Sequence, residues 1–100
     1  MLTYEVYQTE QFRYWLNSIR DPQDKFRLLI RLDRASRGNL GNIKSVGTGL
    51  FEMREFFGPG WRMYFVEPRK GQLIMLGGGT KSSQSRDIVR AKQRMQEFKP

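Results

Sequence analysis

The sequence predicts an α+β fold with a four-stranded antiparallel sheet, two N-terminal helices and one C-terminal helix. Three segments carry apolar residues at helical spacing, two in the first third of the chain and one near its end. One β-rich segment precedes the first helix, and three more, separated by Gly/Pro turns, follow the second. The order β-α-α-β-β-β-α is typical of an α+β fold. We expect residues 1–100 to form a single domain.

The N-terminal third is expected to contain one strand and two helices. Residues 4–8 alternate in character and predict a strand, and Thr9 is a suitable N-cap for the first helix. The apolar stripe of that helix is Phe12, Trp15, Leu16 and Ile19. Asp21 and Pro22 predict the start of a second helix, which ends at Gly38. Its predicted core residues are Phe26, Leu29, Ile30, Leu32 and Ala35, and its predicted outer residues are Lys25, Arg27, Arg31, Arg34 and Arg37.

The remaining elements are a loop, three strands and a helix. Four glycines within residues 38–49 predict a loop. Strands are expected at 50–57, 61–66 and 72–76, joined by Gly58-Pro59-Gly60 and by a turn within residues 68–71. The last helix is predicted over 87–98, with a buried stripe of Ile88, Ala91, Met95 and Phe98.

The hairpin around Pro59 predicts a polar and aromatic sheet face. If the hairpin is centred on Pro59, Arg54 lies opposite Tyr64 and Phe56 lies opposite Arg62. Side chains alternate between the two faces of a strand, so one solvent-exposed face is expected to carry Glu52, Arg54, Phe56, Arg62 and Tyr64. The opposite, core face is expected to carry Met53, Met63 and Phe65. Arginines beside aromatic rings suit a phosphate and its neighbouring bases, although an ordinary exposed face with an incidental Glu52–Arg54 ion pair is the alternative.

Composition narrows the classes of function. The net charge is +8 and most basic residues are arginine, whose planar donor fork fits phosphate oxygens, so a nucleic acid or ribonucleoprotein partner is expected. Cysteine and histidine are both absent, which argues against a thiol nucleophile, a hydrolase triad and a zinc or iron site. We therefore expect no metal and no other cofactor. The sequence has no long apolar run and no N-terminal signal sequence, so a cytoplasmic location without a membrane partner is expected.

The glycine run 77–79 followed by Thr80 and Lys81 only superficially resembles a phosphate-binding loop. The glycines do not have the spacing of a nucleotide-binding P-loop. A strand end, a flexible turn and a helix N-terminus beside Lys81 and Ser83 would still favour a phosphate group. Simple helix capping by Ser83 or Ser85, with Asp87 in the first turn, is the alternative.

Two longer segments carry a family resemblance. The segments GNLGNIKSVGTGLFEMREFFGPGWRMYF (38–65) and LGGGTKSSQSRDIVRAK (76–92) resemble the small toxins of the RelE/ParE superfamily, in the HigB-like or addiction-module killer branch. The resemblance extends over residues 4–96. It implies a RelE-like fold and a toxin neutralised by a cognate antitoxin, typically a helix-turn-helix protein that carries the pair to operator DNA.

The resemblance also implies a reaction and a site. Members of the ribonuclease branch cut mRNA on the ribosome, where a ribose 2′-hydroxyl attacks the adjacent phosphate. By position, Arg62 would hold that phosphate, and Lys81 would neutralise it or protonate the leaving oxygen. Arg54 and Lys44 would position the RNA backbone, and Phe56 and Ser83 would add RNA contacts. Tyr64, with a pKa lowered by the flanking arginines, is the expected proton acceptor, and Glu52 and Asp87 are alternatives.

Two other functions remain compatible with the sequence. The ParE branch inhibits DNA gyrase by protein contact and needs no nuclease site. A non-catalytic nucleic-acid-binding relic that acts with its antitoxin at an operator is the second alternative. Convergence of Arg54, Arg62 and Lys81 on one phosphate-sized space would favour the nuclease.

Overall fold

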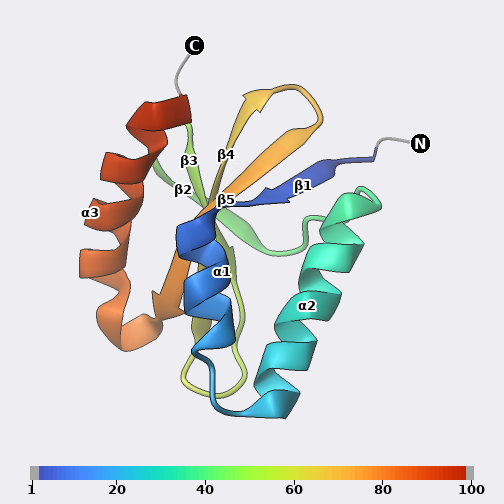
Figure 1. Cartoon of the computed structure of the whole chain (residues 1–100), viewed down its shortest axis with the longest axis vertical. Coiled ribbons are helices and arrows are strands. Elements are labelled where there is room, and N and C mark those ends of the chain that lie inside the picture. The colour runs from blue at the N-terminus through green and yellow to red at the C-terminus, as the bar shows by residue number, and fades with distance from the viewer. Residues whose placement is uncertain (1–2, 99–100) are drawn as a thin grey trace.

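The computed structural model describes residues 3–98. They form one β-sheet with helices packed on both of its faces (Figure 1). In chain order the elements are β1 (Glu5–Gln8), α1 (Glu10–Asn17), α2 (Pro22–Ser36), β2 (Ile43–Gly47), β3 (Leu50–Arg54), β4 (Trp61–Arg69), β5 (Gln72–Thr80) and α3 (Gln84–Met95). Short 3₁₀ turns, Lys81–Ser83 and Gln96–Phe98, flank α3. Within this described range no helix is long and apolar enough to cross a lipid bilayer.

The sheet has five strands in the order β1-β5-β4-β3-β2. The prediction of four antiparallel strands is therefore wrong in two respects. First, β1 pairs with β5 in parallel, while the other pairs are antiparallel. Second, residues 43–47 of the expected loop form β2 at the sheet edge. An edge strand is held by backbone hydrogen bonds and needs little apolar burial, and the glycines around β2 suggested a loop although the strand itself contains only Gly47.

Two apolar clusters fix the helices to the sheet. On one face, α1 and α2 pack on β3, β4 and β5, and the predicted α1 stripe is confirmed, with Phe12, Leu16 and Ile19 buried and Trp15 packed against them. On the other face, Ala91 and Met95 of α3 are buried in a second cluster, with Ile88 and Phe98 packed against it, as predicted. In Figure 1, α1 lies in front of β5, and α2 and α3 lie to either side of the sheet.

Helix α2 faces the core with a different stripe from the one expected. Its buried residues are Leu28, Arg31, Leu32 and Ala35, whereas Phe26 and Leu29 are exposed. Arg31 is buried because the protein supplies acceptors for its guanidinium group. It donates to the carbonyl oxygens of residues 40, 42 and 54 and to the Glu55 carboxylate. Arg31 thereby ties α2 to the start of β2 and the end of β3.

The β3–β4 hairpin is centred on Gly58, one residue earlier than predicted. Arg54 pairs with Arg62 and Glu52 pairs with Tyr64, a shift of two residues from the expected partners. A two-residue shift preserves the face of each side chain, so Met53, Met63 and Phe65 do lie on the core face. The strand ends at Arg54, and residues 55–60 form the turn, in which Gly58 and Gly60 have positive φ values of 57° and 77°.

The glycine run lies inside β5 and not in a flexible turn. Two helices approach this strand so closely that side chains would not fit. A Cβ atom on Gly78 would lie 2.5–2.6 Å from ring atoms of Trp15 in α1, and one on Gly79 would lie 1.8 Å from a carboxylate oxygen of Asp87 in α3. The glycines therefore serve helix–sheet packing.

Candidate active site

A basic cavity of about 290 Å³ lies at one end of the β3–β4 hairpin. Its walls are Arg54 at the end of β3, Arg62 near the start of β4, Lys81 directly after β5, and Phe56 with residues 58–60 of the turn. The cross-strand pairs Arg54–Arg62 and Trp61–Thr80 bring these three ends together. Three cationic side chains thus share a space large enough for a phosphate group and part of a nucleotide.

Arg62 forms the inner wall of this cavity and is almost completely buried, at 2% exposure. Its Nη1 donates to the carbonyl oxygens of Glu55 (2.8 Å) and Trp61 (3.2 Å), and its Nε lies 3.9 Å from the Glu52 carboxylate. Among residues 3–98 the Arg62 guanidinium donates hydrogen bonds through Nη1 only, so Nη2 remains free to donate to a ligand. The expectation of a solvent-exposed face is wrong here, because the Arg62 guanidinium is enclosed by Glu52, residue 55 and Phe56, and α3 packs on Tyr64 farther along β4.

Burial also changes what removal of Arg62 would do. On the exposed-face hypothesis, Arg62→Ala would leave stability unchanged. In the structure it would leave a cavity at a buried position and two carbonyl groups without their donor. Activity loss in that variant would therefore be confounded with destabilisation, and Lys81 is the better residue to test.

Lys81 and Phe56 form the outer part of the cavity. Lys81 is exposed, and Phe56, which follows the end of β3, is 70% exposed. The guanidinium carbons of Arg54 and Arg62 lie 5.6 and 5.8 Å from the centre of the Phe56 ring. An exposed ring between two arginines offers a stacking surface for a base next to a bound phosphate.

Tyr64 and Glu52 lie on the same sheet face but deeper, and both side chains are fully buried. Burial raises the pKa of Tyr64 well above its ordinary value, and the negative charge of Glu52 raises it further. Arg62 lowers the pKa of Tyr64, but this is the smallest of the contributions. The expected direction of the shift is therefore wrong, and Tyr64 remains protonated where a general base would have to be ionised.

The raised pKa of Tyr64 predicts a loss of stability in alkali. In the unfolded chain tyrosine ionises near pH ~10, whereas folded Tyr64 keeps its proton. The free energy of unfolding should therefore fall by about 1.4 kcal/mol per pH unit once the pH exceeds 10. Tyr64→Phe should remove this part of the loss, as measured by urea unfolding at pH 8 and pH 11. Tyr14→Phe, on an exposed side chain, is the control, and an equal loss in Tyr64→Phe and the wild type would contradict the assignment.

The other predicted site residues do not line the cavity. Lys44 is exposed on β2, where it pairs across the strands with Glu52. The Ser83 hydroxyl accepts a hydrogen bond from the backbone N–H of Thr80 (3.1 Å) and donates to the Asp87 carboxylate. The Asp87 carboxylate itself packs against Gly79. Ser83 and Asp87 are thus engaged with each other at the start of α3.

Gln84 is a residue of this region that the sequence reasoning missed. It is the first residue of α3, and its Nε2 donates to Glu52 Oε2 at 2.9 Å. The helix was predicted to begin at residue 87, which left Gln84 outside it. Its spacing to Ile88, Ala91 and Met95 continues the buried stripe of α3 by one turn, and this spacing could have identified it.

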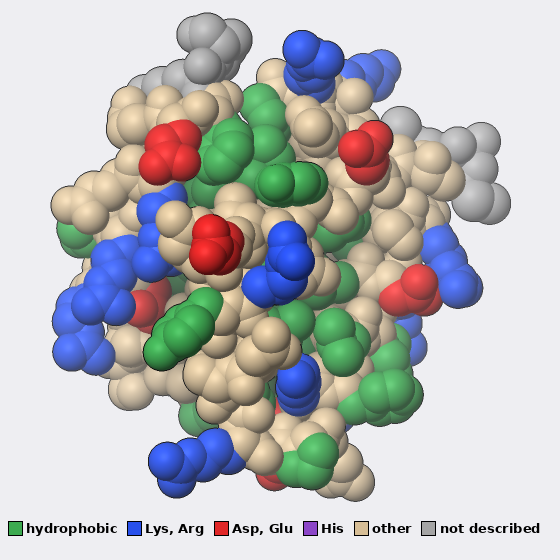
Figure 2. Space-filling model, viewed as in Figure 1, with side chains coloured by type: hydrophobic (Ala, Val, Ile, Leu, Met, Phe, Trp, Pro, Cys, Tyr) green, Lys and Arg blue, Asp and Glu red, His purple; other side chains and the backbone are tan. Residues whose placement is uncertain are grey.

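Basic side chains also extend along α3, and Figure 2 shows Lys and Arg gathered over this helix on the face viewed. The residues are Arg86, Arg90, Lys92 and Arg94.

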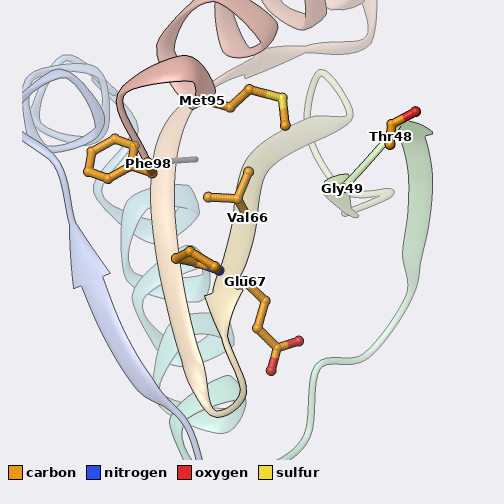
Figure 3. Close-up of a pocket in the computed structure, with 7 residues that line it drawn as sticks. Thr48, Gly49, Val66, Glu67, Met95 and Phe98 are labelled. Carbon is orange, nitrogen blue, oxygen red and sulfur yellow. The ribbon is translucent and has the colours of Figure 1, made fainter. Parts of the chain in front are cut away.

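An apolar cavity of about 390 Å³ lies at the far end of β4. The side chains of Val66, Met95 and Phe98 line it (Figure 3). The cavity lined by Arg54, Arg62 and Lys81 is thus basic, whereas the cavity at the far end of β4 is mainly apolar.

Comparison with known proteins shows a close relative and a shared fold. The chain is 38% identical over 97 residues to a protein of Haemophilus influenzae described as uncharacterized, which covers 97% of this chain and 98% of the relative. No family model matches the sequence. A chain in the crystal structure of the RelBE2 toxin–antitoxin complex from Mycobacterium tuberculosis superposes with a TM-score of 0.63 at 19% identity, covering 79% of this chain and 99% of that one. The likeness shows the fold, which is RelE-like.

Proposed function

Because this chain belongs to the same protein family as the Haemophilus influenzae protein and has a RelE-like fold, we propose that it is the toxin of a toxin–antitoxin pair and cuts mRNA on the ribosome. We place it in the HigB-like branch on the two motifs at 38–65 and 76–92. The observation that best supports nuclease activity is that Arg54, Arg62 and Lys81 line one cavity. Inhibition of gyrase by protein contact would need no such arrangement.

The proposed reaction is an intramolecular transesterification at one phosphodiester bond of the RNA. The ribose 2′-oxygen forms a bond to the adjacent phosphorus while the bond from phosphorus to the 5′-oxygen of the next nucleotide breaks. The products are a 2′,3′-cyclic phosphate and a free 5′-hydroxyl. Arg62 Nη2 and Lys81 Nζ stabilise the extra negative charge of the five-coordinate phosphorus, and Lys81 gives a proton to the leaving oxygen.

The chain contributes charge stabilisation more than base catalysis. No carboxylate or phenol of the described residues lines the cavity, and Glu52 and Tyr64 are fully buried behind it. The proton of the 2′-hydroxyl therefore passes to water. Arg54 positions the RNA backbone and Phe56 stacks on a neighbouring base.

The proposed partners follow from the same surface. The basic side chains of α3 add to the electrostatic attraction for mRNA and ribosomal RNA. A cognate antitoxin, of helix-turn-helix type, would mask the cavity and carry the complex to operator DNA. Action on ribosomes places the protein in the cytoplasm.

The test is induction of the protein alone, followed by primer extension on cellular mRNA. We expect growth arrest and discrete new 5′ ends within coding regions, and rescue of growth by co-expression of the neighbouring gene. The mRNA bound to purified ribosomes should also be cut in the presence of EDTA, with polyamines added to keep the ribosomes intact. The reason is that the chain has no histidine or cysteine to hold a metal. Growth arrest with intact transcripts and broken chromosomal DNA would instead support the gyrase alternative.

A further inference from the structure

A buried carboxylate lies directly behind the two arginines of the cavity. Glu52 has no exposed surface, and its Oε1 faces the Nε atoms of both Arg54 (3.6 Å) and Arg62 (3.9 Å). Its other oxygen accepts the hydrogen bond from Gln84. These contacts join β3 and β4 to the first turn of α3.

The three facing atoms make no hydrogen bond to any residue of 3–98. Glu52 Oε1, Arg54 Nε and Arg62 Nε are all buried without a hydrogen bond in the described part of the chain. A buried charge without compensation is costly, so the carboxylate and the two guanidinium groups depend on each other electrostatically. Arg54 and Arg62 are held from their Nε side, which leaves their outer edges toward the cavity.

We propose that Glu52 is a positioning residue that orients Arg54 and Arg62 for phosphate, with Gln84 holding Glu52 in turn. This proposal rests on the proposed nuclease function for its catalytic consequence. Glu52 does not act as the proton acceptor, because it has no exposed surface and does not line the cavity. The negative charge of Glu52 also offsets part of the local positive charge, and therefore weakens RNA binding while it improves the geometry of the site.

Glu52→Gln should separate these two effects. The amide keeps the size of the side chain but loses the charge that attracts both Nε atoms. We expect kcat for cleavage of ribosome-bound mRNA to fall by about 10- to 100-fold, as for misplacement of a catalytic group. KM should stay equal or decrease, because the site becomes more positive. Glu67→Gln is the matched control, since Glu67 is exposed in β4 near the opposite end of the hairpin.

A second readout does not depend on cleavage. In ¹⁵N–¹H NMR spectra of the full chain, the Nε–H signals of Arg54 and Arg62 should be resolved from those of exposed arginines and assigned with Arg54→Lys and Arg62→Lys. Glu52→Gln should shift both signals, and Glu67→Gln should shift neither. Unchanged signals in Glu52→Gln would overturn the proposal even if the enzyme were active.

The outcomes keep the two proposals distinguishable. If the wild type cuts no RNA but the NMR signals move, the nuclease function fails and the orienting role stands. If Glu52→Gln does not fold, Gln84→Ala tests the same contacts, because it removes the hydrogen bond that holds Glu52. We then expect a smaller shift of the Arg54 and Arg62 Nε–H signals and a smaller loss of kcat. An increase of KM with unchanged kcat in either variant would contradict the proposal.

Discussion

Lys81→Ala should slow cleavage of ribosome-bound mRNA by about 10²–10³-fold and leave the melting temperature unchanged. A donor aimed at charge that develops in the transition state contributes roughly 2.7–4 kcal/mol. Lys81 lines the cavity opposite the turn and is exposed, with no hydrogen bond or ion pair to the rest of the described chain. Its removal should therefore change the free energy of unfolding by no more than about 0.5 kcal/mol.

Lys70→Ala is the matched control for Lys81→Ala. Lys70 is also exposed, but it lies in the β4–β5 turn, at the opposite end of that hairpin from Lys81. Both variants lose one positive charge, so a general weakening of RNA binding would affect them equally. Single-turnover cleavage with saturating ribosomes and a thermal melt are the two measurements. Wild-type cleavage by Lys81→Ala would show that the site is misplaced.

Gly78→Ala should destabilise the protein by about 3 kcal/mol, which lowers the melting temperature by more than about 10 °C. The new methyl group would lie 2.5–2.6 Å from three atoms of the Trp15 ring. The movement of that ring is restricted, because it packs against the rings of both Phe12 and Trp61. Trp61 is fixed in turn by a hydrogen bond from its Nε1 to Asp24 (3.0 Å).

Gly77→Ala tests the same chemical change one residue away. Its Cβ would lie 2.5 Å from Arg94 Nη1, the end of a flexible side chain that can move. The expected cost is about 1 kcal/mol, the loss of the hydrogen bond from Arg94 to the Leu76 carbonyl oxygen. Urea unfolding of both variants measures the difference. Equal destabilisation by Gly78→Ala and Gly77→Ala would show that the packing of Trp15 is not the reason for the glycine at position 78.

The parts of the fold that local periodicity controls could be predicted from the sequence. Thr9 caps α1, Asp21 caps α2, and the α1 stripe follows its 3.6-residue spacing. The face of each side chain in the β3–β4 hairpin was also predictable, because it depends only on odd or even position. The exact partner was not, because it depends on how many residues the turn holds, and Glu55–Gly60 form a longer turn than Gly58-Pro59-Gly60.

Tertiary contacts controlled the parts that could not be predicted. Arg31 is buried because carbonyl groups from distant loops converge on it, and no local pattern indicates such acceptors. The same holds for Tyr64, on which α3 packs, and for Arg62, which residues of the turn and Glu52 enclose; both were placed in solvent because these contacts are not local. From the sequence, convergence of Arg54, Arg62 and Lys81 was only the feature that would favour a nuclease, and the structure shows the three lining one cavity. The contact between Gln84 and Glu52 could not be foreseen without the correct start of α3.

The parallel pairing of β1 with β5 sets when a newly made chain can complete its sheet. Residues 5–8 cannot pair until residues 72–75 have been synthesised, and Lys81 and Gln84 are synthesised after those. Contacts between such distant parts of a chain form slowly, because a long loop must close first. During synthesis the growing polypeptide therefore emerges with Arg54, Arg62 and Lys81 still apart. A ribosome must therefore translate past residue 84 before the proposed site of this protein can assemble.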